Sequence, residues 1–326
     1  MKVSFSYLAR GLIVLSCVMA SSLASAQNFP NKPLRLIVTS APGGVTDVLG
    51  RTVADKLSAV LGQAVVVENV PGGNTMIGAS RALRGDADGY TMFMASSSTL
   101  SLNPATRKKL PYDAEKDFDP VVFLATNEYV VVSRPSLGVK DVAELVDLAR
   151  KKPGSIKYGM SVGAPNHFGP LMLEKAAGIE LMGVPYKDAT QATSGLLTGE
   201  IDIVFAPYPT VEHLIGQKVG VSMLGVANKD RMPQIPDVTT VEEQGFKDVW
   251  ALSWYGIVLK AGAPKEAIDT LNKAINDVLK DEAVRERLFR AGFNVYGGTI
   301  DEFVEYMKKE APVYQKIAQD ANISID

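Results

Sequence analysis

One short pattern in the chain is typical of nucleophilic catalysis. Residues Gly159-Met160-Ser161-Val162-Gly163 match G-x-S-x-G, which in α/β-hydrolases presents a serine on a sharp turn between a strand and a helix. A triad also needs a histidine base, and beyond Ser161 the chain offers only His167 and His213. His213 would have to serve as the base, which would leave the more than one hundred residues after it without a member of the triad. Because five common residues match easily by chance, we favour a structural turn in which Asn166 caps the next helix. An exported serine hydrolase stays the alternative.

Three turns could instead hold a small anion. Ala41-Pro42-Gly43-Gly44-Val45-Thr46-Asp47 is glycine-rich and follows a strand, but it lacks the lysine of a phosphate loop. Its free backbone N–H groups, at the start of a helix, can face an anion. Ser96-Ser97-Ser98-Thr99 adds hydroxyl groups after another strand, and residues 161–167 form a third turn. Each turn alone is usually structural. Three of them at the carboxyl ends of parallel strands favour a binding site between two lobes.

The elements that must position these turns alternate along the chain. Branched and apolar runs predict strands, and apolar residues at helical spacing predict helices between them. Alternation of this kind indicates an α/β protein with mainly parallel sheets flanked by helices. The extended segments 129–132 and 250–255 are candidate crossovers between two lobes. The predicted strands are 34–38, 64–67, 91–94, 156–160 and 201–205, and the predicted helices begin at Thr46 or Asp47, at the capping box of Asp141 and Glu144, at Pro264 and at Asp301.

Composition excludes several classes of protein. The 326 residues fit about two domains of roughly 100–200 residues each. A net charge of −2 offers no electrostatic footprint for nucleic acid or an anionic membrane. Two His and one Cys leave little material for a metal cluster, and we expect no metal and no cofactor.

The N-terminus has the pattern of an export signal. Lys2 and Arg10 precede the apolar run 11–20, and Ala24-Ser25-Ala26 forms an A-x-A cleavage site. We therefore expect residues 1–26 to be a Sec-type signal peptide, cleaved after Ala26, and the protein to be periplasmic. The run is too short for a membrane span, which needs about 20 apolar residues. Processing as a lipoprotein at Cys17 is the alternative.

Beyond these motifs, the chain resembles the receptor family of the tripartite tricarboxylate transporters, the Bug-type extracytoplasmic solute receptors. The resemblance covers essentially the whole chain after residue 26. It implies a two-lobe, type II periplasmic binding protein fold that closes over a carboxylated solute and delivers it to the large and small membrane subunits of a transporter. The expected lobes are 27–128 with 251–326, and 129–250. We expect a monomer; a sensing partner of a membrane kinase would share this ligand chemistry. The matching stretches are 32–38, Gly43-Gly44 with Thr46-Asp47, 65–69, 88–91, 110–113, 116–118, 184–187, 236–240 and 253–256.

The resemblance also implies which residues would contact the solute. Members of the family commonly hold a ligand carboxylate with backbone groups, hydroxyls and ordered water. By position, the first lobe would supply Ala41 to Asp47 and Ser96 to Thr99. The second lobe would supply Ser161, Gly163, Asn166, His167, Tyr186 and the loop after Phe205.

Departures from the family pattern bear on ligand choice. Val45 stands where many members have a third Gly, and Ala164-Pro165 stands near the position where many members have a Gly-Ser pair. Ala206 stands where an Asp is common. Tyr129 replaces a frequent Asn, and Tyr208 follows Ala206-Pro207. These changes predict an aromatic or apolar-bodied mono- or dicarboxylate. Alternatively, both tyrosines pack at the lobe interface without touching solute. His167 would either donate a hydrogen bond to a second carboxylate of the solute or have only a structural role.

Overall fold

The computed structural model describes residues 29–217 and 220–325. The predicted signal peptide, its cleavage site after Ala26 and Cys17 lie outside the described residues. The described chain alternates between strands and helices, as the sequence pattern predicts. Its first part contains β1 (Leu34–Val38), α2 (Val45–Leu61), β2 (Val65–Asn69), α3 (Met76–Leu83), β3 (Thr91–Ser96), the π-helical η1 (Ser98–Leu102), α4 (Asn103–Thr106) and β4 (Phe118–Ser133).

The second part of the chain continues this alternation and returns to the first lobe. It contains η2 (Pro135–Leu137), α5 (Val142–Lys151), β5 (Lys157–Met160), α6 (Pro165–Ala177), β6 (Met182–Pro185), α7 (Ala189–Thr198), β7 (Ile203–Pro207), α8 (Tyr208–Val211), η3 (Glu212–Leu214), β8 (Ser222–Val226), β9 (Leu252–Lys260), α9 (Lys265–Lys280), α10 (Glu282–Arg290), β10 (Asn294–Val295) and α11 (Ile300–Asp320).

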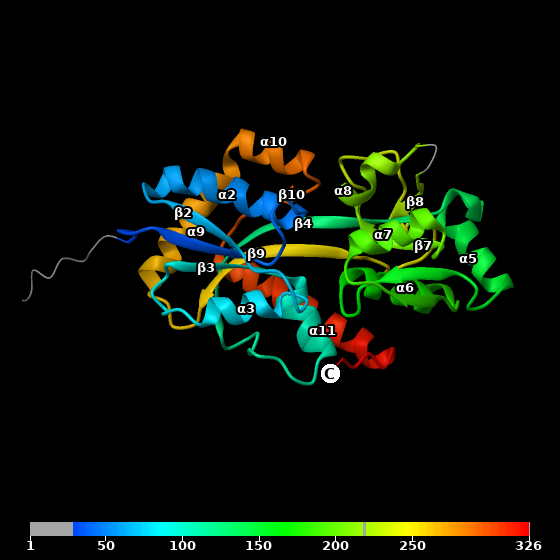
Figure 1. Ribbon diagram of the computed structural model, residues 1–326, viewed down its shortest axis with the longest axis horizontal. Helices are drawn as coiled ribbons and strands as arrows, with labels where there is room; N and C mark the ends of the chain where they lie inside the picture. The colour runs from blue at the N-terminus through cyan, green and yellow to red at the C-terminus, as the bar shows by residue number, and fades with distance from the viewer. Residues whose placement is uncertain (1–28, 218–219, 326) are drawn as a thin grey trace, which may run out of the picture.

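Two long strands connect the lobes. The strand order is β2-β1-β3-β9-β4-β7-β5-β6, and both β8 and β10 pair with β4. β1 runs parallel to β2 and β3, and β5 runs parallel to β6 and β7. β4 pairs with β9 over 118–128 and with β7 over 129–133, antiparallel in both cases. Figure 1 shows β4 and β9 passing from one lobe to the other.

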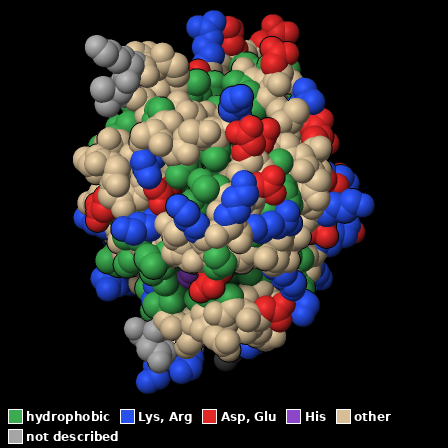
Figure 2. Space-filling model, turned by 90° about the vertical axis from the view of Figure 1, so that its right-hand side faces the viewer, with side chains coloured by type: hydrophobic (Ala, Val, Ile, Leu, Met, Phe, Trp, Pro, Cys, Tyr) green, Lys and Arg blue, Asp and Glu red, His purple; other side chains and the backbone are tan. Residues whose placement is uncertain are grey.

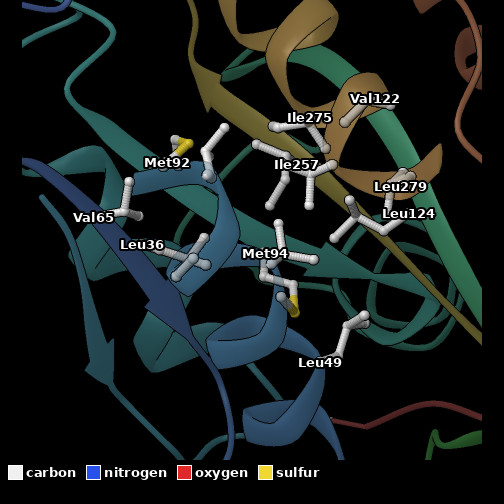
Figure 3. Packing of buried hydrophobic residues seen from close by; sticks show 14 of the residues in the cluster. Leu36, Leu49, Val65, Met92, Met94, Val122, Leu124, Ile257, Ile275 and Leu279 are labelled. Atoms are coloured by element: carbon white, nitrogen blue, oxygen red, sulfur yellow. The ribbon is translucent and has the colours of Figure 1, made fainter. Parts of the chain in front are cut away.

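Helices cover both faces of each lobe's sheet. In the first lobe, α2 and α9 pack over Leu36 and Met94, which Figure 3 shows from close by. The opposite face buries Phe93 against α3 and the start of α11. In the second lobe, α5 and α6 cover one face, and α7 and α8 cover the other. The chain therefore folds as an α/β protein with two lobes, as the sequence pattern predicts. No helix of the described part is both long and apolar enough to cross a membrane.

Two predicted helix caps are wrong. Helix α2 begins at Val45 after the N-cap Gly44, so neither Thr46 nor Asp47 caps it. The Asp47 carboxylate instead accepts a hydrogen bond from Gly43 N, which stabilises the loop before the helix. Helix α6 begins at Pro165, which leaves Asn166 in the first turn and not at the cap. In both cases a residue that favours a cap uses its side chain to close the preceding loop.

The end of β3 passes directly into a helix at the position where we expect a turn. The strand ends at Ser96, and the chain is helical from Ser97 through the π-helix η1. Ser96, Ser97 and Thr99 are buried. A π-helical segment is rare and is often found at a functional site. The hydroxyl groups at this strand end are therefore held in a packed helical turn.

Candidate functional site

The loop after β1 is fixed by one buried carboxylate. Asp47 is 2% exposed, and its oxygens accept hydrogen bonds from Gly43 N at 2.8 Å, Asn69 Nδ2 at 2.7 Å and Arg51 Nε at 2.9 Å. Burial alone would raise the pKa of Asp47, but the Arg51, Asn69 and Gly43 donors outweigh it and hold the pKa below its usual value. Asp47 thus shapes the loop, in which Gly44 N also donates to Ala41 O at 3.1 Å.

The helical turn after β3 is braced by a strained neighbouring segment. Thr99 Oγ1 donates to Thr75 Oγ1 at 2.8 Å. Asn74 and Thr75 have φ of 47° and 75°, the left-handed region that non-glycine residues rarely adopt. Asn74 Nδ2 donates to Asn103 Oδ1 at 2.9 Å, and Asn103 Nδ2 donates back to Asn74 O at 2.8 Å. Backbone strain that is over-determined by hydrogen bonds clusters at functional sites.

The loop after β5 has two internal hydrogen bonds. Asn166 Oδ1 accepts from Ser161 N at 3.0 Å, and His167 Nδ1 accepts from Gly163 N at 3.3 Å. Gly163 has a φ of 78°, which favours glycine there. Burial of His167 lowers its pKa to about 4. The imidazole is therefore neutral at physiological pH, and because Nδ1 is an acceptor, its proton sits on Nε2.

This third loop contacts the first lobe. Asn74 Nδ2 lies 3.3 Å from Gly163 O, across the two lobes. A Cβ at Gly163 would also lie 3.3 Å from Thr106 Oγ1 and 3.0 Å from the side chain of Ile325. The loop after β5 therefore lies against the segment around Asn74, whose neighbour Thr75 contacts Thr99.

Four buried polar atoms at these strand ends have no hydrogen-bond partner among the described residues. They are Ser40 Oγ after β1, Ser97 Oγ after β3, Ser161 Oγ after β5 and Asn166 Nδ2 in the first turn of α6. A buried polar group without a partner costs free energy and calls for an explanation. All four atoms can donate hydrogen bonds, which is the chemistry that a carboxylate needs.

Predicted ligand contacts at the crossovers are buried. Tyr129 is 6% exposed, and its hydroxyl lies 3.2 Å from Ser253 Oγ, where either can donate. Burial, with the nearby Tyr255, raises the pKa of Tyr129. Thr46 Oγ1 donates to the hydroxyl of Tyr255 at 3.4 Å. The glycine-rich loop is thus tied directly to β9, one of the two connecting strands.

The remaining candidates lie inside the second lobe. The ring of Tyr186 packs against Gly195 of α7, where a Cβ would lie 2.2 Å from the tyrosine hydroxyl. Ala206 is fully buried opposite Val130, and Pro207 pairs with Tyr129. Tyr208 is 6% exposed and belongs to the apolar cluster of α7 and α8. The two tyrosines Tyr129 and Tyr208 therefore pack into the lobe cores at the connection between lobes.

Sequence reasoning missed Ser40, Asn74 and Thr75. Ser40 directly precedes the glycine-rich loop, and its position after β1 was the available signal. Asn74 and Thr75 follow Pro71-Gly72-Gly73, a run that indicates a turn but not the contact across the lobes.

The geometry does not form a hydrolase site. Ser161 Oγ has no hydrogen-bond partner among the described residues, and the Nδ1 of His167 is occupied by Gly163 N. A serine nucleophile needs a base within hydrogen-bond reach. Over 29–217 and 220–325, no group of three or more His, Cys, Asp or Glu could hold a metal ion.

Two α/β lobes joined by two connecting strands, with buried unpaired donors at strand ends of both lobes, are the architecture of a two-lobe solute-binding protein. Comparisons with known proteins give the family. Residues 49–323 match the family described as "TctC: Tripartite tricarboxylate transporter family receptor", and the chain belongs to this family. Its members are solute receptors and not enzymes, so the serine hydrolase alternative is wrong.

Individual relatives agree with this assignment. The chain is 31% identical to the "UPF0065 protein in tcbD-tcbE intergenic region" of Pseudomonas sp. (strain P51), over 94% of this chain and 93% of that protein. It is similar to the solved structure "R. palustris Rpa4515 with adipate" at 27% identity and a TM-score of 0.83, covering 91% of this chain and 99% of that one. It is also similar to "periplasmic binding protein BugD", at 26% identity and a TM-score of 0.78, over 91% and 99% of the two chains.

Proposed function

We propose that this receptor captures a small carboxylate between its two lobes, using the loops 40–47, 96–99 and 161–167. The observation that supports the proposal best is the set of four buried, unpaired donors at the ends of β1, β3 and β5. A carboxylate accepts several hydrogen bonds at once, so one ligand group could satisfy more than one of these atoms. Differential affinity of a ligand for the closed arrangement would then shift the lobes toward it.

Recognition would rest on neutral donors. None of the three loops contains Lys or Arg, and the whole chain carries a net charge of only −2. Figure 2 shows basic and acidic side chains intermixed on the outer end of the second lobe. Hydrogen bonds to an ionised group are roughly twice as strong as neutral ones, so oriented N–H and O–H groups suffice for an anion.

His167 is our candidate for a second carboxylate. It is 7% exposed and lies six residues after Ser161, whose Oγ is unpaired. Because Nδ1 accepts from Gly163 N, the Nε2–H group is the donor that remains for a ligand. A neutral donor would favour a dicarboxylate without requiring a positive charge.

The body of the ligand would be apolar or aromatic. Ala206 offers no acceptor for an ammonium or hydroxyl group, and Tyr129 and Tyr208, although packed into apolar clusters, place rings near the same connection where polar side chains would otherwise stand. The related R. palustris protein was solved with adipate, a dicarboxylate whose body is a plain hydrocarbon chain. We therefore infer an aromatic or apolar-bodied mono- or dicarboxylate in preference to an amino acid or citrate.

Export and delivery complete the proposal. A leader cleaved after Ala26 would place the receptor in the periplasm, where it would act as a monomer. It would there hand its solute to the large and small membrane subunits of a tripartite tricarboxylate-type transporter. A role as the sensing partner of a membrane kinase would use the same site, and growth on the ligand after deletion separates the two roles.

The test is a panel of acids measured by thermal shift and titration calorimetry. We expect adipate and aromatic acids such as terephthalate and benzoate to raise the melting temperature, and aspartate and citrate to leave it unchanged. Stabilisation by citrate or aspartate alone would refute the apolar-bodied assignment. Absence of stabilisation by every carboxylate, with no carboxylate copurifying in mass spectrometry, would refute the proposed function itself.

A further inference from the structure

A cavity beside the connecting strands differs in chemical character from the proposed carboxylate site. It has a volume of about 530 Å³ and is lined by residues of β4, β9 and α11, by the segment after β8 and by the segment after β10. None of the proposed carboxylate contacts lines it. Its size falls within the roughly 300–1,000 Å³ of sites that hold small molecules.

The neighbouring residues Glu128 and Tyr129 lie on opposite faces of β4. Successive side chains of a strand point to opposite faces, so Glu128 points away from the face of Tyr129. The strand register supports this division, because Glu128 pairs with Leu252, which also lines the cavity. Tyr129 instead contacts Ser253, the next residue along β9.

Glu128 is the central observation. It is 2% exposed, and its Oε1 accepts from Thr126 Oγ1 at 2.9 Å and from Asn294 Nδ2 at 2.6 Å. Its other oxygen, Oε2, has no hydrogen-bond partner among the described residues. A buried carboxylate that is left half-paired is costly, and a cation beside it relieves that cost.

The other walls of the cavity also favour a cation. Asp230 and Glu302 add two carboxylates, and the described residues that line the cavity include no Lys, Arg or His. The rings of Phe123, Tyr296 and Tyr306 lie side by side, with the Tyr296 and Tyr306 centroids 5.1 Å and 4.8 Å from that of Phe123. Aromatic faces attract organic cations within about 6 Å of the ring centroid.

We propose that this cavity binds a small organic cation through a primary ammonium or guanidinium group, with Glu128 as its counter-ion and the Phe123–Tyr296–Tyr306 rings packing on its carbon chain. A metal ion fits the walls less well, because calcium and magnesium demand several oxygen ligands at short range. In the described part of the chain, no acidic group clusters tightly enough to hold one. The same chemistry could come from a free amine or from a lysine side chain of another protein.

The test is titration calorimetry of the purified protein with putrescine, ethylguanidine and Nα-acetyl-lysine amide. Glu128→Gln removes the charge while keeping an oxygen acceptor for Thr126 and Asn294, and Asp230→Asn removes an exposed charge on a loop. We expect the wild type to bind at least one of these cations, Glu128→Gln to weaken it at least tenfold, and Asp230→Asn to weaken it severalfold. Asp55→Asn, an exposed acidic residue on α2, is the matched control and should change nothing.

Several results would overturn the proposal. These are no binding of any of the three cations at millimolar concentration, equal affinity in the wild type and both cavity variants, or binding of Mg²⁺ or Ca²⁺ without binding of any amine. Should Glu128→Gln fail to fold, the comparison of Asp230→Asn with Asp55→Asn decides. A preference for putrescine over the blocked lysine identifies a free amine as the source, and the reverse identifies a protein side chain; either preference supports the cation site.

Discussion

Asn74 Nδ2 lies 3.3 Å from Gly163 O and forms a hydrogen bond between the two lobes. Asn74 belongs to the segment that braces the β3 loop, and Gly163 belongs to the loop after β5. The Asn74 side chain therefore ties the loop after β5 to the segment whose next residue, Thr75, contacts Thr99. Its own backbone has a φ of 47°, so the local conformation is held by these contacts.

Replacing Asn74 tests whether this link supports the closed arrangement. Asn74→Gly suits a left-handed backbone, so the change removes the amide without adding strain. We expect severalfold weaker binding of adipate, measured by calorimetry, with a loss of stability of only about 1 kcal/mol. Asp248→Gly, at an exposed residue with a φ of 59°, controls for the added glycine. Equal affinity in Asn74→Gly and Asp248→Gly would contradict a role for the link.

Removal of the unpaired hydroxyls should separate binding from stability. Ser97 and Ser161 lose no internal hydrogen bond when their Oγ atoms are deleted, because these atoms have no partner among the described residues. We therefore expect Ser97→Ala and Ser161→Ala to melt at or above the temperature of the wild type. Each should lose one hydrogen bond to an ionised ligand, about 1.5–3 kcal/mol, which weakens binding roughly ten- to a hundredfold.

The chain contains a matched control for these two variants. Ser133 Oγ is also buried and unpaired within the described chain. Ser133 is the last residue of β4 and pairs with Ile203 at the start of β7, away from the strand-end loops. Ser133→Ala should share the effect on melting temperature and leave ligand affinity unchanged. If all three variants bind adipate with wild-type affinity, the unpaired donors are not the ligand contacts.

Local patterns explain why the strand-end loops were predictable. Gly43, Gly44 and Gly163 mark turns, and their positions after branched or apolar runs place them at strand ends. Local sequence patterns do not indicate which distant residues or strands pair with one another. β9 runs antiparallel to β3 across more than 150 residues of sequence, and the Asp47 carboxylate is held in part by Asn69, 22 residues away. The Asn74–Gly163 contact is of the same kind, because neither residue's neighbours in sequence indicate it.

Glu310 should make stability depend on pH. Burial raises its pKa to about 7, although Trp254 Nε1 and Ser101 Oγ donate to it. The folded state thus favours the protonated carboxyl, so the stability that this group contributes is complete below about pH 4.5 and is lost as the pH rises toward 7. The effect amounts to about 1.4 kcal/mol for each pKa unit.

Denaturation of Glu310→Gln across this range is the measurement. The amide keeps an acceptor for Trp254 and Ser101 but cannot ionise. We expect the variant to lose less stability than the wild type between pH 5 and 7, as measured by urea unfolding. Parallel curves for the two proteins would show that Glu310 does not titrate in this range.

His167 should make stability depend on pH in the opposite direction. Its pKa is lowered to about 4 by burial, so the folded state favours the neutral ring. The stability that this contributes is complete above about pH 6.5 and is lost as the pH falls toward 4. In His167→Asn, the amide oxygen can accept from Gly163 N in place of Nδ1, and the titrating ring is gone. We expect the variant to lose less stability than the wild type between pH 6.5 and 4 in urea unfolding.

The same variant tests the proposed second carboxylate contact. The shorter amide side chain has no donor at the position of Nε2, so we expect His167→Asn to bind adipate about tenfold more weakly, which corresponds to about 1.4 kcal/mol. Hexanoate has the same carbon chain and only one carboxylate, so its affinity should not change. Calorimetry with both acids on both proteins gives the comparison. An equal loss for adipate and hexanoate would mean that His167 shapes the loop at Gly163 and does not contact the second carboxylate.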